Sequence, residues 1–281
     1  MRLFAIAESS KKPLGLAIFP GFFAPEWAKE GATTALFTIP YGPGAGRVEK
    51  LPLPWDEVYL NRWFGFLKQL GDRYGRSPVF RQIGAAGPTS VSTEMSLPDR
   101  PKDKDVQKWM DLSYRPSKYV AAWRATFQAY DRYFPNQYIS LSFYPSLPIN
   151  EQGKLDRAER TTQSIIEMGI GLLGGRMEFL ICDLTGHPQV PGSSLMASYI
   201  GRVITGWVAG TSASANSKAM GAEGDAPLAL RRTIDNGLKP NSDGKHVDFL
   251  VLYEADINAE EMQPVLKYGA SLFGPPNRSA R

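Results

Sequence analysis

The sequence predicts an α/β protein, specifically a TIM-type (β/α) barrel lacking the first two βα units. Short apolar runs of strand length alternate along the chain with longer segments in which apolar residues recur every three or four positions. Strands that alternate with helices form a parallel sheet with right-handed crossovers. Six such strands precede helices, whereas a closed barrel of this type has eight. A doubly wound open sheet is the alternative, although no glycine-rich dinucleotide fingerprint follows any predicted strand.

Each element is predicted from its spacing and from its end signals. Residues 1–12 have the apolar spacing of the last turns of an amphipathic helix. Pro116 suits the first turn of a helix and Gly75 a helix end, while Asn258 and Glu261 match a capping pair for the last helix. The predicted strands are 14–19, 79–83, 138–143, 177–182, 205–208 and 247–252, and the predicted helices are 55–74, 116–134, 156–173, 193–203, 225–236 and 258–273.

The chain is predicted to form one partial barrel domain over residues 1–281. Residues 22–54 are too many for a simple connection, so they are interpreted as a long loop excursion with one β-like run at 34–39. Residues 275–281 form a short basic tail. The missing units would leave an open barrel edge, whose unpaired strand groups could associate with another chain.

Composition argues against several classes of function. The net charge of +4 comes from scattered lysines and arginines, so no basic block indicates nucleic-acid binding. The single cysteine, Cys182, excludes an intramolecular disulfide and is expected to be a buried apolar residue. With only two histidines, neither a metal site nor a cofactor is predicted. No apolar stretch is long enough to span a membrane, and no signal-peptide pattern is present, which leaves the location open.

Aromatic and polar residues are concentrated after the predicted strands, where TIM barrels carry their functional groups. Aromatic faces stack on the C–H faces of sugar rings, while carboxylates and amides bind sugar hydroxyls. The mixture therefore predicts a carbohydrate ligand. Core packing is the competing interpretation for Trp207, and it is the expected role of Trp63 and Trp123 on helix faces. The residues predicted to bind the carbohydrate are Trp27, Tyr144, Asp183, His187, Trp207 and Tyr253.

Two glutamates that follow different strands, Glu94 and Glu254, are the candidate catalytic groups. Glycoside hydrolysis uses two carboxyl groups, one to protonate the leaving oxygen and one to attack the anomeric carbon or to activate water. The competing interpretation for Glu94 is a loop carboxylate bound to backbone N–H groups. For Glu254 it is a charge that stabilises the following helix N-terminus. Asp256 is expected to cap the final helix.

Five segments resemble the barrel domain of clan A-like glycoside hydrolases, a group with beta-galactosidase-like and cellulase-like members. The resemblance covers most of the chain, and it implies a (β/α)8 fold and retaining hydrolysis of a β-linked sugar. It also implies an acid/base glutamate after the fourth strand, which corresponds to Glu94. The segments are FPGFFAPEW (19–27), LPWDEVY (53–59), RYG (73–75), GPTSVSTEM (87–95) and LYEAD (252–256).

The sequence departs from the family pattern in two places. Thr93 precedes Glu94 where the family typically has asparagine, and residues 206–217 contain no Asp or Glu where the family has its nucleophile after the seventh strand. The second carboxylate is therefore either Glu254 or Asp183. The alternatives to a glycosidase are a non-catalytic carbohydrate-binding barrel and an inactive fragment of a glycosidase-like protein.

Overall fold

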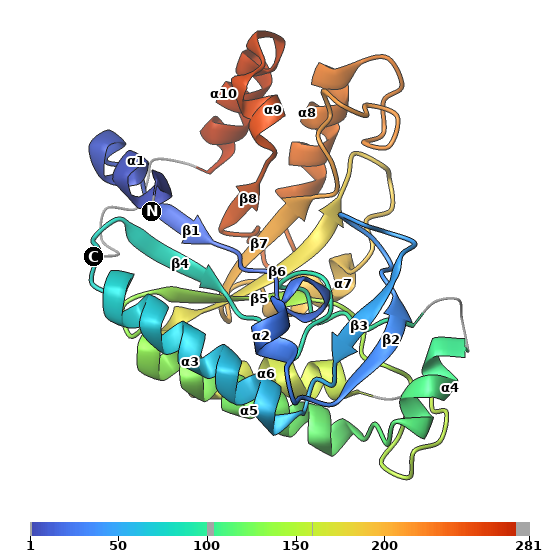
Figure 1. Cartoon of the computed structure of the whole chain (residues 1–281). Helices are drawn as coiled ribbons and strands as arrows, with labels where there is room; N and C mark the ends of the chain where they lie inside the picture. The colour runs from blue at the N-terminus through green and yellow to red at the C-terminus, as the bar shows by residue number, and fades with distance from the viewer. Residues whose placement is uncertain (1, 100–103, 159, 274–281) are drawn as a thin grey trace. The chain divides into compact units, whose positions relative to one another are not determined.

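The computed structural model describes residues 2–99, 104–158 and 160–273 (Figure 1). The chain divides into two compact units, Met1–Met177 and Glu178–Arg281. Parallel strands alternate with helices in both units, which confirms the predicted α/β class. The described residues contain six parallel strands, an arrangement compatible with a TIM-like fold. The predicted basic tail at 275–281 lies outside the described residues.

The first unit is built on parallel strands in the order β1 (Leu14–Leu16), β4 (Phe80–Gly84) and β5 (Tyr138–Phe143). All three overlap the predicted strands. Ile83 of β4 and Ile139 of β5 pair across the ladder, and both are completely buried. Branched apolar side chains of this kind fit a parallel sheet that is covered on both faces.

Three long helices cover this part of the sheet and lie side by side in Figure 1. Asp56 caps the first of them, because its Oδ1 accepts a hydrogen bond from the Tyr59 backbone N–H at 2.9 Å. Pro116 occupies the first turn of the second, as predicted. The helices are α3 (Glu57–Tyr74), α5 (Pro116–Tyr133) and α6 (Thr161–Leu173), and the short 3-10 helix η2 (Gly174–Arg176) follows α6.

Aromatic side chains dominate the core of the first unit. Trp123 is completely buried and Trp63 is buried, which confirms both as core residues. The predicted N-terminal helix is α1 (Arg2–Ser10), and its Phe4 ring stacks on the Tyr74 ring with centroids 4.1 Å apart. Phe4 also packs edge-on against Phe80 of β4, with ring centroids 5.5 Å apart, so α1 contacts both α3 and the sheet.

The predicted loop excursion at 22–54 contains regular structure. Its β-like run is β2 (Thr34–Thr38), which pairs with β3 (Val48–Pro52) in an antiparallel hairpin. The apolar pattern does not predict β3, because its first three residues are exposed and two of them are charged. The remaining short elements of the first unit are η1 (Gly21–Phe23), α2 (Glu26–Lys29) and α4 (Lys104–Asp111).

The second unit has parallel strands in the order β6 (Met177–Leu184), β7 (Ile204–Ala209) and β8 (Phe249–Val251). Cys182 in β6 is half-buried, so the expectation of a buried residue is wrong. Asp225 caps the helix after β7 by accepting a hydrogen bond from the Leu228 backbone N–H at 2.9 Å. The helices are α7 (Ser193–Tyr199), α8 (Ala226–Gly237), α9 (Glu254–Asn258), the 3-10 helix η3 (Glu260–Met262) and α10 (Gln263–Leu272).

The end of the chain differs from its prediction. The single helix predicted over 258–273 is divided into η3 and α10, and α9 precedes them. Asn258 is the last residue of α9, so the predicted capping pair with Glu261 is wrong. Pro264 lies in the first turn of α10, where its missing N–H is not needed, and a new helix therefore begins there.

Three buried tyrosines in the first unit predict a loss of stability at alkaline pH. Burial raises the pKa of Tyr59, Tyr119 and Tyr130 above the ordinary value of 10.0. Because the folded state holds these protons more tightly, their contribution is complete below pH 10 and is lost as pH rises toward the folded pKa. Between the pKa of the unfolded state and that of the folded state, each tyrosine lowers the free energy of unfolding by about 1.4 kcal/mol per pH unit.

Thermal melts between pH 8 and pH 12 measure this effect, with phenolate absorbance followed in parallel. We expect a steep fall in Tm above pH 10, with part of the phenolate signal appearing only on unfolding. Titration of all 12 tyrosines near pH 10 with the fold intact would contradict the assignment.

Candidate functional site

The loop after β4 is an almost fully buried platform, formed by residues 85–97. Aromatic side chains of the surrounding helices hold its first part through the Ala86 peptide. Ala86 donates its backbone N–H to the Tyr130 hydroxyl at 3.0 Å, and its carbonyl accepts from the Trp63 indole N–H at 2.6 Å. Loops are normally exposed and mobile, so a loop held this way is preorganised.

The second part of the platform is held by hydrogen bonds within the loop and by hydrogen bonds to β5. Ser90 donates both its backbone N–H and its hydroxyl to the Ser96 carbonyl, at 3.2 and 2.7 Å. The Met95 carbonyl accepts from the Tyr119 hydroxyl at 2.9 Å, and the Met95 N–H donates to the Ser142 carbonyl at 3.0 Å. These bonds fix the segment 94–96 against the carboxyl end of β5.

Glu94 lies on this fixed segment. It forms an isolated parallel bridge with Ser142, next to the last residue of β5, and its side chain is half-buried. The sequence places Glu94 ten residues beyond the end of β4, and the fold returns it to the carboxyl end of the neighbouring strand. Functional groups of α/β barrels lie at this end of the strands.

Tyr41 orients the Glu94 carboxylate. Its hydroxyl donates to Glu94 Oε2 at 2.5 Å and lies 2.6 Å from the Ser96 hydroxyl. Burial and, next, the Glu94 charge raise the pKa of Tyr41 well above its ordinary value, so the phenol keeps its proton at neutral pH. The sequence does not single out Tyr41, because it lies 53 residues from Glu94 within a stretch rich in glycine turns.

The other predicted residues of the first unit are Trp27 and Tyr144. Trp27 lies on α2 and is 55% exposed, which is unusual for tryptophan and leaves its ring open to solvent. Tyr144 follows β5 directly and is half-buried, and its carbonyl accepts a hydrogen bond from the Thr162 hydroxyl at 3.3 Å. Tyr144 is therefore two residues from Ser142, the bridge partner of Glu94.

In the second unit, Asp183 and His187 lie at and after the carboxyl end of β6. Asp183 is exposed and has a φ of 70°, and the pairing register with β7 shifts around it. Aspartate tolerates this left-handed conformation better than most residues do. His187 is also exposed, and its Nε2 lies 3.2 Å from the Ala219 carbonyl oxygen in the loop after β7.

Tyr253 and Glu254 follow β8 and are both exposed. Tyr253 precedes α9, and its hydroxyl lies 3.5 Å from the Gly210 carbonyl oxygen. Glu254 is the first residue of α9, and its Oε1 lies 3.5 Å from the Asn258 amide nitrogen. A carboxylate in the first turn of a helix interacts favourably with the helix dipole.

Asp256 has a structural role that the sequence does not predict. It is completely buried and accepts hydrogen bonds from the Ser212 hydroxyl at 2.8 Å and from the Ala213 and Ser214 backbone N–H groups at 3.0 and 2.8 Å. The expectation that it caps the final helix is wrong. Its carboxylate instead holds the loop after β7 against the segment after β8.

Replacing Asp256 with alanine is expected to lower the free energy of unfolding by about 3 kcal/mol, because two backbone N–H groups and one hydroxyl would lose their buried acceptor. Chemical denaturation measures the loss. Asp243→Ala removes an exposed carboxylate from the same unit and should change stability by less than about 0.5 kcal/mol. Equal stability losses in the two variants would contradict the role assigned to Asp256.

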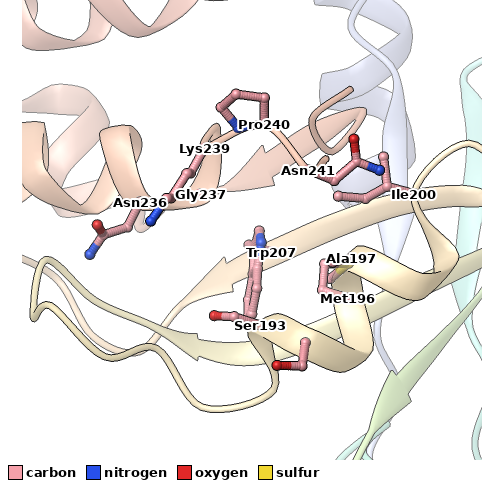
Figure 2. A pocket seen from close by; sticks show the side chains of 11 residues that line it. Ser193, Met196, Ala197, Ile200, Trp207, Asn236, Gly237, Lys239, Pro240 and Asn241 are labelled. Atoms are coloured by element: carbon pink, nitrogen blue, oxygen red, sulfur yellow. The ribbon is translucent and has the colours of Figure 1, made fainter. Parts of the chain in front are cut away.

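Trp207 lines a cavity of about 270 Å³ in the second unit. Figure 2 shows its side chain between α7 and the segment that carries Asn236 to Asn241. None of Asp183, His187, Tyr253 and Glu254 is among the residues that line this cavity. The lining residues are Ser193, Ser194, Met196, Ala197, Ile200, Trp207, Asn236, Gly237, Lys239, Pro240 and Asn241.

Glu94, Trp27 and Tyr144 thus belong to the first unit, and the other predicted site residues belong to the second. Within the described residues, no group of three or more His, Cys, Asp or Glu side chains could hold a metal ion. No helix in the described ranges is long and apolar enough to cross a membrane. No known family model matches the sequence, and no curated protein matches it.

Proposed function

We propose that this protein is a glycoside hydrolase of the TIM-barrel type that acts on a β-linked sugar, with Glu94 as its acid/base group. The observation that carries the proposal is the position of Glu94 on a buried platform at the carboxyl end of β5, with its carboxylate held by the Tyr41 hydroxyl at 2.5 Å. Catalytic groups need this kind of fixed orientation, because small displacements reduce the rate strongly.

The hydroxyl chain beside Glu94 suits a group that alternates between acid and base. When Glu94 is ionised, Tyr41 donates to its Oε2 and Ser96 can donate to the Tyr41 oxygen. When Glu94 is protonated, its own hydroxyl can donate to the Tyr41 oxygen while Tyr41 donates to Ser96. Both protonation states therefore keep a full set of hydrogen bonds. A retaining glycosidase needs both states, because the same carboxyl first gives a proton to the leaving oxygen and then takes one from water.

The second carboxylate is a choice between Glu254 and Asp183. Asp183 lies at the carboxyl end of β6, Glu254 follows β8, and both are exposed, so either is open to a substrate. The exposed rings of Trp27 and Tyr253 are suited to stacking on sugar faces. The side chain of Asp256 is unsuited to catalysis, since hydrogen bonds from the 212–214 loop occupy both of its oxygens.

The direct test is turnover of aryl β-glycosides of several sugars by the purified protein, with aryl α-glycosides as the comparison. We expect release of the phenol from at least one β-glycoside and none from its α-anomer. A protein that binds sugars saturably but hydrolyses none of the β-glycosides above the uncatalysed rate would support the non-catalytic carbohydrate-binding barrel instead.

A further inference from the structure

The cavity beside Trp207 has the size of a site for a small molecule. Its volume of about 270 Å³ lies near the lower end of the range for ligand sites, which is about 300 Å³. It is an open hollow lined by α7, by Trp207 of β7, and by the segment from Asn236 to Asn241 (Figure 2). A cavity of these dimensions can hold one sugar ring and cannot hold a long oligosaccharide.

Trp207 supplies this cavity with an indole N–H that has no hydrogen-bond partner among the described residues. The residue is 4% exposed, as for a core side chain. Its indole N–H donates to no group in the described part of the chain. Within the same residues, the Trp123 indole N–H is also unpaired but is fully buried, whereas the Trp207 N–H keeps some accessible surface. The Trp207 N–H is therefore open to a ligand. A buried tryptophan normally finds a partner for this group, so an open one beside a cavity indicates a binding surface.

The polar groups around the cavity favour an anionic ligand. Lys239 is the charged residue of the lining, which contains no Asp or Glu. Its ammonium group has no ion-pair partner among the described residues. Asn241 Oδ1 accepts from the backbone N–H groups of Asp243 and Lys245, both at 3.0 Å, which leaves the Asn241 amide N–H groups as donors.

Asn236 complements these donors with an acceptor. Its Nδ2 donates to the carbonyl oxygens of Thr185 and His187, both at 2.8 Å, so the amide orientation is fixed and Oδ1 remains to accept a hydroxyl. The hydroxyl of Ser194 is exposed and has no partner in the described ranges. The cavity thus combines an unpaired indole donor, hydroxyl-binding groups and one uncompensated positive charge.

We propose that this cavity is a binding site for a single sugar ring that carries a carboxylate, that is, a hexuronic acid. The Trp207 N–H donates to one ring hydroxyl, the carboxylate pairs with Lys239, and the amides of Asn236 and Asn241 bind other ring hydroxyls. Charge-assisted hydrogen bonds are stronger than neutral ones, so Lys239 selects the acid over the neutral hexose. This site does not depend on Glu94 or on hydrolysis.

Calorimetric titration of the full chain with D-glucuronate, and separately with D-glucose, tests the proposal. We expect saturable binding of glucuronate and at least about 10-fold weaker binding of glucose. Lys239→Met should weaken glucuronate binding by about 10-fold and leave glucose unchanged. Lys154→Met removes an exposed positive charge in the first unit and should leave both affinities unchanged. Lys239 is exposed, so its replacement should not affect folding.

Trp207→Phe removes the indole N–H donor and should weaken the binding of both sugars. Absence of saturable glucuronate binding would overturn the proposal. Equal affinities for glucuronate and glucose, or an unchanged glucuronate affinity in Lys239→Met, would overturn the assignment of an acidic sugar.

Discussion

Replacing Glu94 with glutamine is expected to lower kcat/KM for an aryl β-glycoside by about 10³-fold, because general acid and base catalysis contributes 10² to 10⁴. Glutamine has nearly the same size and can still accept a hydrogen bond from Tyr41, so the platform should keep its structure. The substitution removes only the ability of this side chain to give and take a proton. The loss should be larger for a phenyl glycoside than for a dinitrophenyl glycoside, since the weakly basic dinitrophenolate leaves without a proton.

Glu49→Gln provides the matched control. Glu49 is an exposed residue of the β2–β3 hairpin in the same unit, and its neutralisation should leave kcat/KM unchanged. Both variants should melt within a few degrees of the wild-type protein. Wild-type activity in Glu94→Gln would remove Glu94 from the mechanism.

Replacing Gly21 with alanine should destabilise the first unit by about 4 kcal/mol, the sum of a steric clash and a left-handed backbone conformation, and should disturb the Glu94 platform at the same time. Gly21 has a φ of 64°, and a Cβ there would lie well within 3.0 Å of the Ser90 and Thr89 backbone oxygens. The Phe22 N–H donates to the same Ser90 carbonyl at 2.9 Å, and the Gly21 N–H donates to the Tyr59 hydroxyl at 2.9 Å. Relief of the clash must break these bonds or move the loop.

Gly31→Ala separates the two causes. Gly31 has a similar φ of 71°, but a Cβ there meets nothing within 4 Å. The control should therefore cost only the conformational penalty, about 1 kcal/mol, and should leave activity intact. Denaturation curves and activity assays of both variants give the comparison. Similar losses in the two variants would show that backbone conformation, and not contact with the platform, decides the effect.

The sequence predicts the positions of the parallel strands and of most helices well, because the decisive signals are local. Pro116 marks the start of one helix and Gly75 the end of another. Apolar runs such as the one in β5 are too short for a helix and contain enough apolar residues for a buried strand. The hairpin strand β3 is not predicted from the sequence. It is a strand because it pairs with β2, and its own apolar pattern does not indicate one. The single helix predicted at the end of the chain is divided at Pro264.

The candidate site is predicted in part, and the missing part consists of contacts between distant residues. Glu94 can be singled out as a carboxylate after a strand, but spacing alone cannot join it to Tyr41, 53 residues away. Asp256 lies beside Glu254 in the sequence, yet its burial depends on the 212–214 loop. The sequence around Trp207 would look the same whether its side chain lay in a core or in a cavity wall. Its surroundings therefore follow only from the packing of α7 and the 236–241 segment.

Chemical rescue of Glu94→Ala by azide tests the acid/base role of Glu94 most directly. With a dinitrophenyl β-glycoside, the leaving group departs without a proton and leaves a glycosyl ester on the second carboxylate. Azide then attacks the anomeric carbon, needs no base, and releases that carboxylate. We predict that azide accelerates turnover of the variant and yields the β-glycosyl azide. No acceleration, or formation of the α-glycosyl azide, would contradict an acid/base role for Glu94.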